Sequence, residues 1–201
     1  NAPAVERAVM LKVGLTGGLA CGKSFVAEEL ERLGCLVIRA DELGHQVLEP
    51  GGEAYAGVVR EFGEEILDAG GRIDRGRLAA RVFDNPERLA KLNALVHPPV
   101  QRREEELMAA FAREHPRGIA VVEAAILIET GSHRRFDRLV VVVCDPARQI
   151  ERAMARGASR EEVLARIGRQ MPLEEKRKFA DYVIDSSGAR EETLEATRRV
   201  Y

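Results

Sequence analysis

The fold is decided by one stretch of the sequence, residues 10–34, which reads MLKVGLTGGLACGKSFVAEELERLG. Its first part, Met10 to Thr16, is a short apolar run that predicts a strand. Its last part, Ser24 to Leu33, has apolar residues at helical spacing, and it precedes Gly34, a residue type that commonly ends a helix. The glycine-rich turn between the two parts completes a unit of strand, loop and helix.

The turn carries the pattern of a phosphate-binding loop, or P-loop, because Gly17 and Gly22 bracket four residues and Lys23-Ser24 follows. Backbone N–H groups of such a loop surround a phosphate, and the positive end of the helix dipole points at the same anion. A chance glycine-rich turn is the alternative, and the flanking strand and helix argue against it. We therefore expect Lys23 to act in catalysis at the β- and γ-phosphates and Ser24 to bind Mg²⁺. The residues expected to bind ATP are Gly17, Gly18, Leu19, Ala20, Cys21, Gly22, Lys23, Ser24 and Phe25.

Strands and helices alternate along the rest of the chain, as in α/β proteins with a parallel sheet of the P-loop NTPase type. Four further apolar segments lack polar alternation, which suits strands covered on both faces. They are Cys35 to Ile38, Ile119 to Val122, Leu139 to Cys144 and Tyr182 to Ile184. The sequence thus predicts a five-stranded parallel sheet with flanking helices.

Two other blocks complete the predicted organisation. Residues 10–42 and 116–201 form the core, and residues 43–115 form a helical insertion that is too large for an ordinary crossover and is expected to bind a substrate. Within the insertion, Asp74 and Asn85 are expected N-caps, and Pro86 suits the first position of a helix. An arginine-rich stretch at about residues 148–170 is the expected lid, and Ser159 with Glu162 has the pattern of a capping box.

The composition limits the partners. The 31 Lys and Arg residues and 33 Asp and Glu residues give a net charge of −2, so no overall basic field attracts nucleic acid or an anionic membrane. No apolar run approaches the roughly 20 residues that span a bilayer. Three cysteines without metal-like spacing indicate neither a disulfide framework nor zinc. We expect a cytoplasmic monomer or weak homo-oligomer. Residues 1–9 are expected to be an irregular extension, part of it a tag remnant, and are left out of the argument.

Asp41 is the first candidate for acid–base chemistry. It follows the second predicted strand, and ligands of open α/β sheets bind at the carboxyl ends of the strands. A carboxylate there can accept the proton of an attacking hydroxyl group. Capping a helix that starts at Glu42 is an equally common task for Asp, so both interpretations stay open.

Several further motifs, taken together and in this order, resemble those of dephospho-coenzyme A kinase. They are Gly14-Leu15-Thr16-Gly17-Gly18 with the P-loop, Ala40-Asp41, Leu92-Asn93-Ala94-Leu95-Val96-His97-Pro98, Gln170-Met171-Pro172-Leu173-Glu174-Glu175-Lys176, and Ala180-Asp181-Tyr182-Val183-Ile184-Asp185. The resemblance extends over nearly the whole chain from Met10. It implies that ATP, with Mg²⁺, phosphorylates the ribose 3′-hydroxyl of dephospho-coenzyme A in the last step of coenzyme A synthesis. It also implies that His97 contacts the acceptor and that Arg166 and Gln170 contact substrate.

The chain departs from the family pattern at several positions. Arg39 stands where the family commonly has a first Asp, Ala20-Cys21 replaces Gly-Ser in the P-loop, and Phe25 replaces Thr. Because backbone N–H groups hold the phosphate, we expect the P-loop replacements to be tolerated. The third-strand element lacks a common proline, and Ser186-Ser187-Gly188 replaces Asn-X-Gly near the expected adenine contacts.

The arginines of the lid are the remaining candidates. Arg152 and Arg156 lie four residues apart on one helix face, where they can neutralise charge on the transferring phosphoryl group, Arg156 in a catalytic role and Arg152 in substrate binding. Pairing with the nearby Glu151, Glu161 and Glu162 on a solvated helix is the alternative. Glu123, at the end of the third strand, is either a magnesium-site carboxylate or a structural acid.

Two other functions fit the P-loop by itself. One is a different small-molecule kinase, of the nucleoside monophosphate or shikimate type, which substrate profiling separates. The other is a GTPase-like switch, but the chain contains no Asn-Lys-X-Asp string for reading guanine.

Overall fold

The computed structural model describes residues 9–201, and residues 1–8 of the expected N-terminal extension lie outside the described part. The chain divides into two compact units. The first, the sheet unit, comprises residues 9–38 and 110–201, and the second, the helical unit, comprises residues 39–109. The long helix α5 (Pro86–Glu114) crosses the boundary between them.

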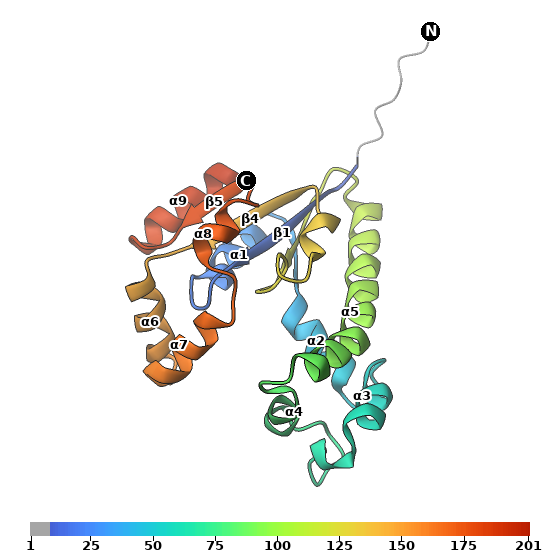
Figure 1. The fold of residues 1–201 in the computed structure, drawn as a ribbon. Coiled ribbons are helices and arrows are strands. Elements are labelled where there is room, and N and C mark those ends of the chain that lie inside the picture. The colour runs from blue at the N-terminus through green and yellow to red at the C-terminus, as the bar shows by residue number, and fades with distance from the viewer. Residues whose placement is uncertain (1–8) are drawn as a thin grey trace. The chain divides into compact units, whose positions relative to one another are not determined.

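The sheet unit is built on five parallel strands in the order β2-β3-β1-β4-β5, which confirms the predicted sheet (Figure 1). The strands are β1 (Leu11–Gly17), β2 (Leu36–Arg39), β3 (Ile119–Glu123), β4 (Arg138–Val143) and β5 (Tyr182–Asp185). Each lies within one or two residues of its predicted place. The central strand β1 pairs Leu15 with Glu123 of β3 and Gly17 with Val142 of β4. The loop after β1 therefore leaves the middle of the carboxyl edge, between the strand ends that carry these partners.

Helices and one 3₁₀ turn connect or follow the strands of the sheet unit, and α1 ends before Gly34 as predicted. They are α1 (Lys23–Arg32), the 3₁₀ turn η2 (Ser132–Arg135), α6 (Pro146–Ala155), α7 (Arg160–Gly168), α8 (Leu173–Arg177) and α9 (Arg190–Val200). Ser159 and Glu162 form the predicted capping box at the start of α7. One sheet face is covered by α1 and α9, whose apolar residues Val26, Leu30 and Ala196 pack with Leu15 of β1 and Val142 of β4.

The helical unit consists of α2 (Ala40–Leu48), α3 (Tyr55–Phe62), the 3₁₀ turn η1 (Glu64–Ile66), α4 (Arg75–Val82) and most of α5. Both predicted N-caps are confirmed. Asp74 Oδ1 accepts a hydrogen bond from Arg77 N at 2.9 Å, and Asn85 Oδ1 accepts one from Arg88 N at 3.0 Å. The core of the helical unit includes buried apolar residues of α2, α3, η1 and α4: Leu43, Val47, Val58, Phe62, Ile66 and Leu78.

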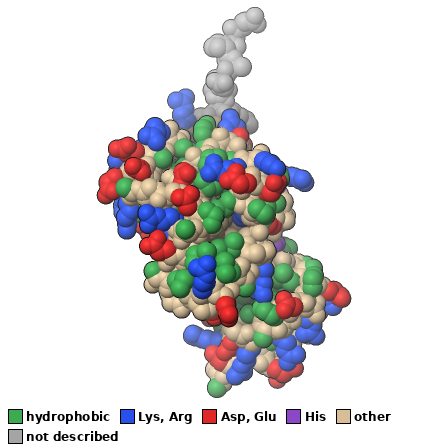
Figure 2. Space-filling model, turned by 60° about the vertical axis from the view of Figure 1, so that its left-hand side comes forward, with side chains coloured by type: hydrophobic (Ala, Val, Ile, Leu, Met, Phe, Trp, Pro, Cys, Tyr) green, Lys and Arg blue, Asp and Glu red, His purple; other side chains and the backbone are tan. Residues whose placement is uncertain are grey.

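Basic and acidic side chains are interspersed on the face of the molecule that Figure 2 draws, in keeping with the near balance of charges in the sequence. Within residues 9–201, no helix is both long and apolar enough to cross a membrane.

Candidate functional site

The P-loop has the backbone conformation that its glycines predicted. Gly22, at the N-cap of α1, is in the left-handed region with φ 83°, which glycine adopts without steric cost. A side chain at Gly22 would meet only Ser186 at 3.8 Å, so the requirement there is conformational rather than spatial. Since α1 begins at Lys23, its first unpaired N–H groups face the end of this loop. The arrangement suits an anion.

Gly17 is required for the opposite reason, because it lies against the backbone of β4. A Cβ atom there would be 2.3 Å from the carbonyl oxygen of Val142. Lys23 reaches back over the loop, where its Nζ donates to Gly18 O at 2.9 Å. The ammonium group therefore lies beside Gly18, in the N-terminal half of the P-loop, which we call its entrance half.

Ala20 is one of two non-glycine residues in the described chain with positive φ, at 55°. The left-handed conformation costs a residue other than glycine about 1–2 kcal/mol, and here it is adopted by a residue with a methyl side chain. Ala20 is buried with Ala153 of α6 and Val163 of α7, and Leu19 packs against the same group. The side chain thus packs against α6 and α7.

Cys21 is buried beneath the P-loop, and its Sγ lies 3.1 Å from Sγ of Cys144 at the end of β4. The hydrogen bond from the Cys144 thiol, together with the nearby Lys23 charge, lowers the pKa of Cys21 against the opposing effect of burial. For Cys35, by contrast, burial is the cause of the shift, and it raises the pKa of the thiol to about 11. All three cysteines are free thiols, as the sequence indicated.

Ser24 and Glu123 meet at the carboxyl end of the sheet. Ser24 Oγ, on the first turn of α1, donates to Glu123 Oε1 at 3.0 Å. Glu123 ends β3, the strand next to β1. A hydroxyl and a carboxylate together are hard oxygen ligands of the kind Mg²⁺ prefers. Residues 9–201 hold no cluster of three or more acidic, histidine or cysteine ligands. That sparse set fits Mg²⁺, which usually takes one or two carboxylates and completes its shell with phosphates and water.

A cavity of ≈ 450 Å³ opens beside the P-loop within the sheet unit. It is lined by Ala20, Gly22, Ser24, Phe25, Glu28, Arg152, Ala155, Arg156, Ser186, Gly188, Arg190 and Thr193. Its walls combine the expected phosphate loop, the lid arginines and the loop after β5, so one nucleotide can meet all three. Arg190, at the start of α9, stacks over the Phe25 ring with its guanidinium carbon 4.4 Å from the ring centroid.

The lid arginines differ in what they contact. Arg152 donates to Ser186 through Nη1 to Oγ at 3.0 Å and through Nη2 to the carbonyl oxygen at 2.6 Å. Ser186 Oγ in turn donates to Cys21 O at 2.7 Å. Arg152 therefore fastens α6 to the loop after β5. Arg156 follows α6 as its C-cap and lines the cavity with an exposed side chain, whereas Arg166 is exposed on α7.

Gln170 contacts the P-loop itself. Its Oε1 accepts a hydrogen bond from Leu19 N at 3.0 Å. The sequence indicated a substrate contact for Gln170 by resemblance to a family, and the contact seen here is with the backbone of the P-loop.

Asp41 and His97 belong to the helical unit. Asp41 is exposed in the first turn of α2, where Arg39 is the N-cap and no side chain caps the helix. The capping interpretation of Asp41 is therefore wrong, because the helix begins two residues earlier than expected. His97 lies within α5, and burial lowers the pKa of its imidazole, which favours the neutral form of the ring. A neutral ring can donate or accept a hydrogen bond but offers no charge to a phosphate.

Sequence reasoning missed several residues of the site. Arg190 and Thr193 lie about 170 residues from the P-loop in the chain, and no local pattern links them to it. The burial of Lys176 and its ion pair with Glu129 were also missed, although Lys176 stands in one of the quoted motifs. A buried lysine has no signature in sequence, since its surroundings are set by tertiary contacts.

Comparison with known proteins identifies relatives of the same kind along nearly the whole chain. A family model described as dephospho-CoA kinase matches residues 11–192. A dephospho-CoA kinase of Aquifex aeolicus (strain VF5) is 41% identical over 192 residues, covering 96% of this chain and 96% of its own. Among solved structures, a Thermus thermophilus protein superposes with a TM-score of 0.81 at 37% identity, covering 96% of both chains. The dephospho-CoA kinase of Campylobacter jejuni superposes with a TM-score of 0.62 at 25% identity, covering 95% of both chains.

Proposed function

The chain belongs to the dephospho-CoA kinase family, and from that premise we propose which of its residues carry the reaction. The reaction transfers the γ-phosphoryl group of ATP to the ribose 3′-hydroxyl of dephospho-coenzyme A, which completes coenzyme A synthesis. The family resemblance of the sequence motifs is thereby confirmed. Membership also sets aside the shikimate, nucleoside monophosphate and GTPase alternatives.

The phosphates of ATP are held by residues 17–24, and Phe25 with Arg190 borders the same cavity. The supporting observation is the P-loop conformation, with Gly22 at φ 83° before α1 and Lys23 Nζ on Gly18 O. With ATP bound, the ammonium of Lys23 exchanges this carbonyl for the β- and γ-phosphate oxygens. A fixed positive charge there stabilises the negative charge that develops on the transferring group.

Ser24 would bind Mg²⁺ through its hydroxyl oxygen, and Glu123 would hold the ion through a water molecule. Their 3.0 Å hydrogen bond places a hydroxyl and a carboxylate side by side at the end of β3. The ion supplies neutralisation of charge on the β- and γ-phosphates. Glu123 also orients the Ser24 hydroxyl group, which donates a hydrogen bond to its carboxylate.

Asp41 is the general base. It follows β2 in the chain, three residues beyond Ile38. β2 is parallel to β1, and its carboxyl end lies at the sheet edge from which the P-loop emerges. A carboxylate at the start of α2, free of a capping task, accepts the proton of the 3′-hydroxyl as the oxygen attacks.

Arg156 stabilises the transferring phosphoryl group from the lid side. Its exposed side chain lines the cavity and is thus available to an anion, whereas Arg152 is engaged with Ser186. We assign Arg152 to shaping the nucleotide cavity. Arg166 serves substrate binding from α7, and Gln170 acts on the P-loop backbone.

The helical insertion, residues 43–115, binds dephospho-coenzyme A, with His97 as a hydrogen-bonding residue for the acceptor. The compact helical unit, Arg39–Ala109, covers most of this range. The neutral form of the His97 imidazole, which burial favours, suits a hydroxyl or amide group better than a phosphate. We propose that the enzyme acts as a monomer or weak homo-oligomer.

Asp41→Asn tests the assignment of the base. The amide cannot take up the hydroxyl proton, so turnover falls by about a hundredfold or more, in the range of general base contributions. Because Asp41 caps no helix, the melting temperature and the affinity for ATP stay near those of the wild type. The neighbouring Glu42→Gln is the matched control, also exposed in the first turn of α2, and is expected to keep full turnover. Wild-type turnover of a folded Asp41→Asn variant would remove Asp41 from the mechanism.

A further inference from the structure

Lys176 of α8 is a fully buried lysine, with 0% of its side chain exposed. Lysine is almost never fully buried unless it is paired. Its Nζ lies 2.8 Å from Ala125 O, 2.9 Å from Glu129 Oε1 and 3.4 Å from Gly17 O. An ammonium group has three N–H donors and accepts nothing. The three acceptors therefore match its hydrogen-bonding capacity, and one of them is the first residue of the P-loop.

The segment Gln170–Lys176, which we call the lid root, follows α7 and leads into α8. Three of its residues, spaced three apart, meet three consecutive residues of the P-loop. Lys176 Nζ points to Gly17 O, Leu173 lies 3.0 Å from where a Cβ of Gly18 would stand, and Gln170 accepts from Leu19 N. The entrance half of the P-loop thus lies along the lid root.

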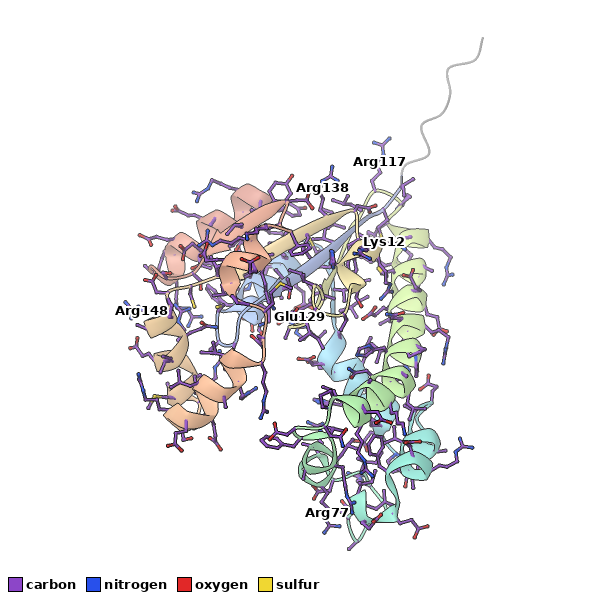
Figure 3. The ribbon with its side chains drawn as sticks, in the orientation of Figure 1. Lys12, Arg77, Arg117, Glu129, Arg138 and Arg148 are labelled. Atoms are coloured by element: carbon purple, nitrogen blue, oxygen red, sulfur yellow. The ribbon has the colours of Figure 1, made fainter. Side chains whose placement is uncertain are left out.

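Glu129 joins the loop after β3 to this arrangement. Its Oε1 accepts from Lys176 Nζ at 2.9 Å and from Met171 N, also in the lid root, at 3.1 Å. Figure 3 shows Glu129 beside the segment that connects α7 to α8. With 22% of its side chain exposed, the carboxylate is largely covered, so it neutralises the buried ammonium at close range.

We propose that Lys176 is a positioning residue for phosphoryl transfer and that Glu129 is its counter-charge. In a trans peptide the C=O of one residue and the N–H of the next point in opposite directions. By holding the Gly17 carbonyl, Lys176 sets the direction of the Gly18 N–H at the entrance of the P-loop. It also ties the base of the lid to that peptide. The inference rests on the phosphate-binding role proposed above for residues 17–24.

A purely structural role for the pair predicts a different outcome in a charge-neutral variant. Removing Lys176 strands the Glu129 carboxylate, so either role predicts a less stable protein. When both charges are removed, a buried pair is often replaced with little loss of stability. The Gly17 and Ala125 carbonyls still lack their donor, however. Only a positioning role predicts that activity stays low in a variant that has regained its stability.

The test compares Lys176→Met with the double variant Lys176→Met/Glu129→Gln, by steady-state kinetics with ATP and dephospho-coenzyme A and by thermal melts. Lys178→Met is the matched control, because Lys178 lies two residues away with an exposed side chain that pairs with Glu175. Kinetics are measured well below the melting transition of each variant. We expect a tenfold or greater fall in kcat for Lys176→Met, with KM for ATP within threefold, since displacement of reacting groups by about 1 Å can cost about a hundredfold.

In the double variant we expect the melting temperature to return towards the wild-type value while kcat stays at least fivefold low. A kcat within twofold of wild type for the folded single variant overturns the proposal, as does recovery of kcat together with the melting temperature. If the double variant does not regain stability, the kcat and KM of the single variant decide. Lys23→Ala distinguishes failure of the positioning role from failure of the phosphate-binding assignment. If Lys23→Ala is inactive while Lys176→Met is fully active, only the positioning role of Lys176 fails. If Lys23→Ala is active, the phosphate-binding assignment of residues 17–24 fails.

Discussion

Replacing Gly17 with alanine tests how closely the P-loop is held to the sheet. The added Cβ would lie 2.3 Å from Val142 O, 3.1 Å from Val142 C and 3.3 Å from Cγ of Lys23. The first two neighbours are backbone atoms of β4, paired in register with Gly17, so they cannot rotate away as a side chain does. Forcing extra volume into a packed site costs about 1–3 kcal/mol. For a chain of this size, about 2 kcal/mol lowers the melting temperature by roughly 4–8 °C.

The same displacement carries the entrance of the P-loop away from β4, and turnover is expected to fall by about a hundredfold. A coupled assay for ADP release, beside a thermal melt, measures both effects. Gly168→Ala is the control, because Gly168 ends α7, has no neighbour within 4 Å of the added Cβ, and should keep its stability within about 1 kcal/mol. A Gly17→Ala variant that melts and turns over like the wild type would refute the close approach of β1 and β4 as the reason for this glycine.

Three further predictions concern Arg156, Ser24 and the ion pair of Arg198 with Glu29. Arg156→Ala should lower kcat by about a hundredfold with little change in the dissociation constant of ATP, because a lid arginine meets its charge best in the transition state; an unaltered kcat returns Arg156 to the solvated surface. Ser24→Ala should raise the Mg²⁺ concentration for half-maximal rate at least tenfold, and an unchanged Mg²⁺ titration removes Ser24 as a ligand. The hydrogen bond from Arg198, 2.7 Å from Glu29 Oε1, lowers the pKa of Glu29, so its stabilisation is present above the unfolded value near 4.3 and disappears as the pH falls through the lower folded pKa. Arg198→Met should therefore melt below the wild type at pH 7, and the difference should shrink as the pH falls below the unfolded value and through the lower folded pKa of Glu29, whereas a constant difference at all pH values contradicts the ion pair.

The sheet and the P-loop were predictable because their signals are local. A run such as Leu139 to Cys144, apolar without alternation, indicates a strand covered on both faces, and β4 lies there. The spacing of Gly17, Gly22 and Lys23 carries the loop conformation in itself. Capping residues such as Asp74 act within four residues of their partner, so they too were found correctly.

The start of α2 shows where local signals fail. Asp is a better N-cap than Arg, yet Arg39 takes the N-cap position and Asp41 falls in the first turn. The helix starts where β2 ends, so the strand and its neighbours set the first helical residue and the local preference of Asp41 does not.

Contacts between residues far apart in the sequence could not be predicted, because no local sequence pattern indicates them. Arg152 is hydrogen-bonded to Ser186, 34 residues away, and no local pattern in the sequence indicates this contact. Lys176 looked like any lysine of a charged helix, and its burial depends on Glu129 and Ala125, 47 and 51 residues away in sequence. Such partners become visible only when the strands bring their loops to one edge of the sheet.

The central claim, that residues 17–24 hold the phosphates of ATP for transfer to dephospho-coenzyme A, is tested most directly by Lys23→Ala. The measurement is the rate of coenzyme A formation from ATP and dephospho-coenzyme A, beside a melt of the same protein. Because Lys23 is partly exposed and its Nζ donates to the carbonyl oxygen of Gly18 in its own loop, the melting temperature should change little. We predict that the rate falls by at least about a hundredfold, as when one charge-stabilising group of a transition state is lost. Coenzyme A formation at a near wild-type rate by a folded Lys23→Ala enzyme would contradict the account.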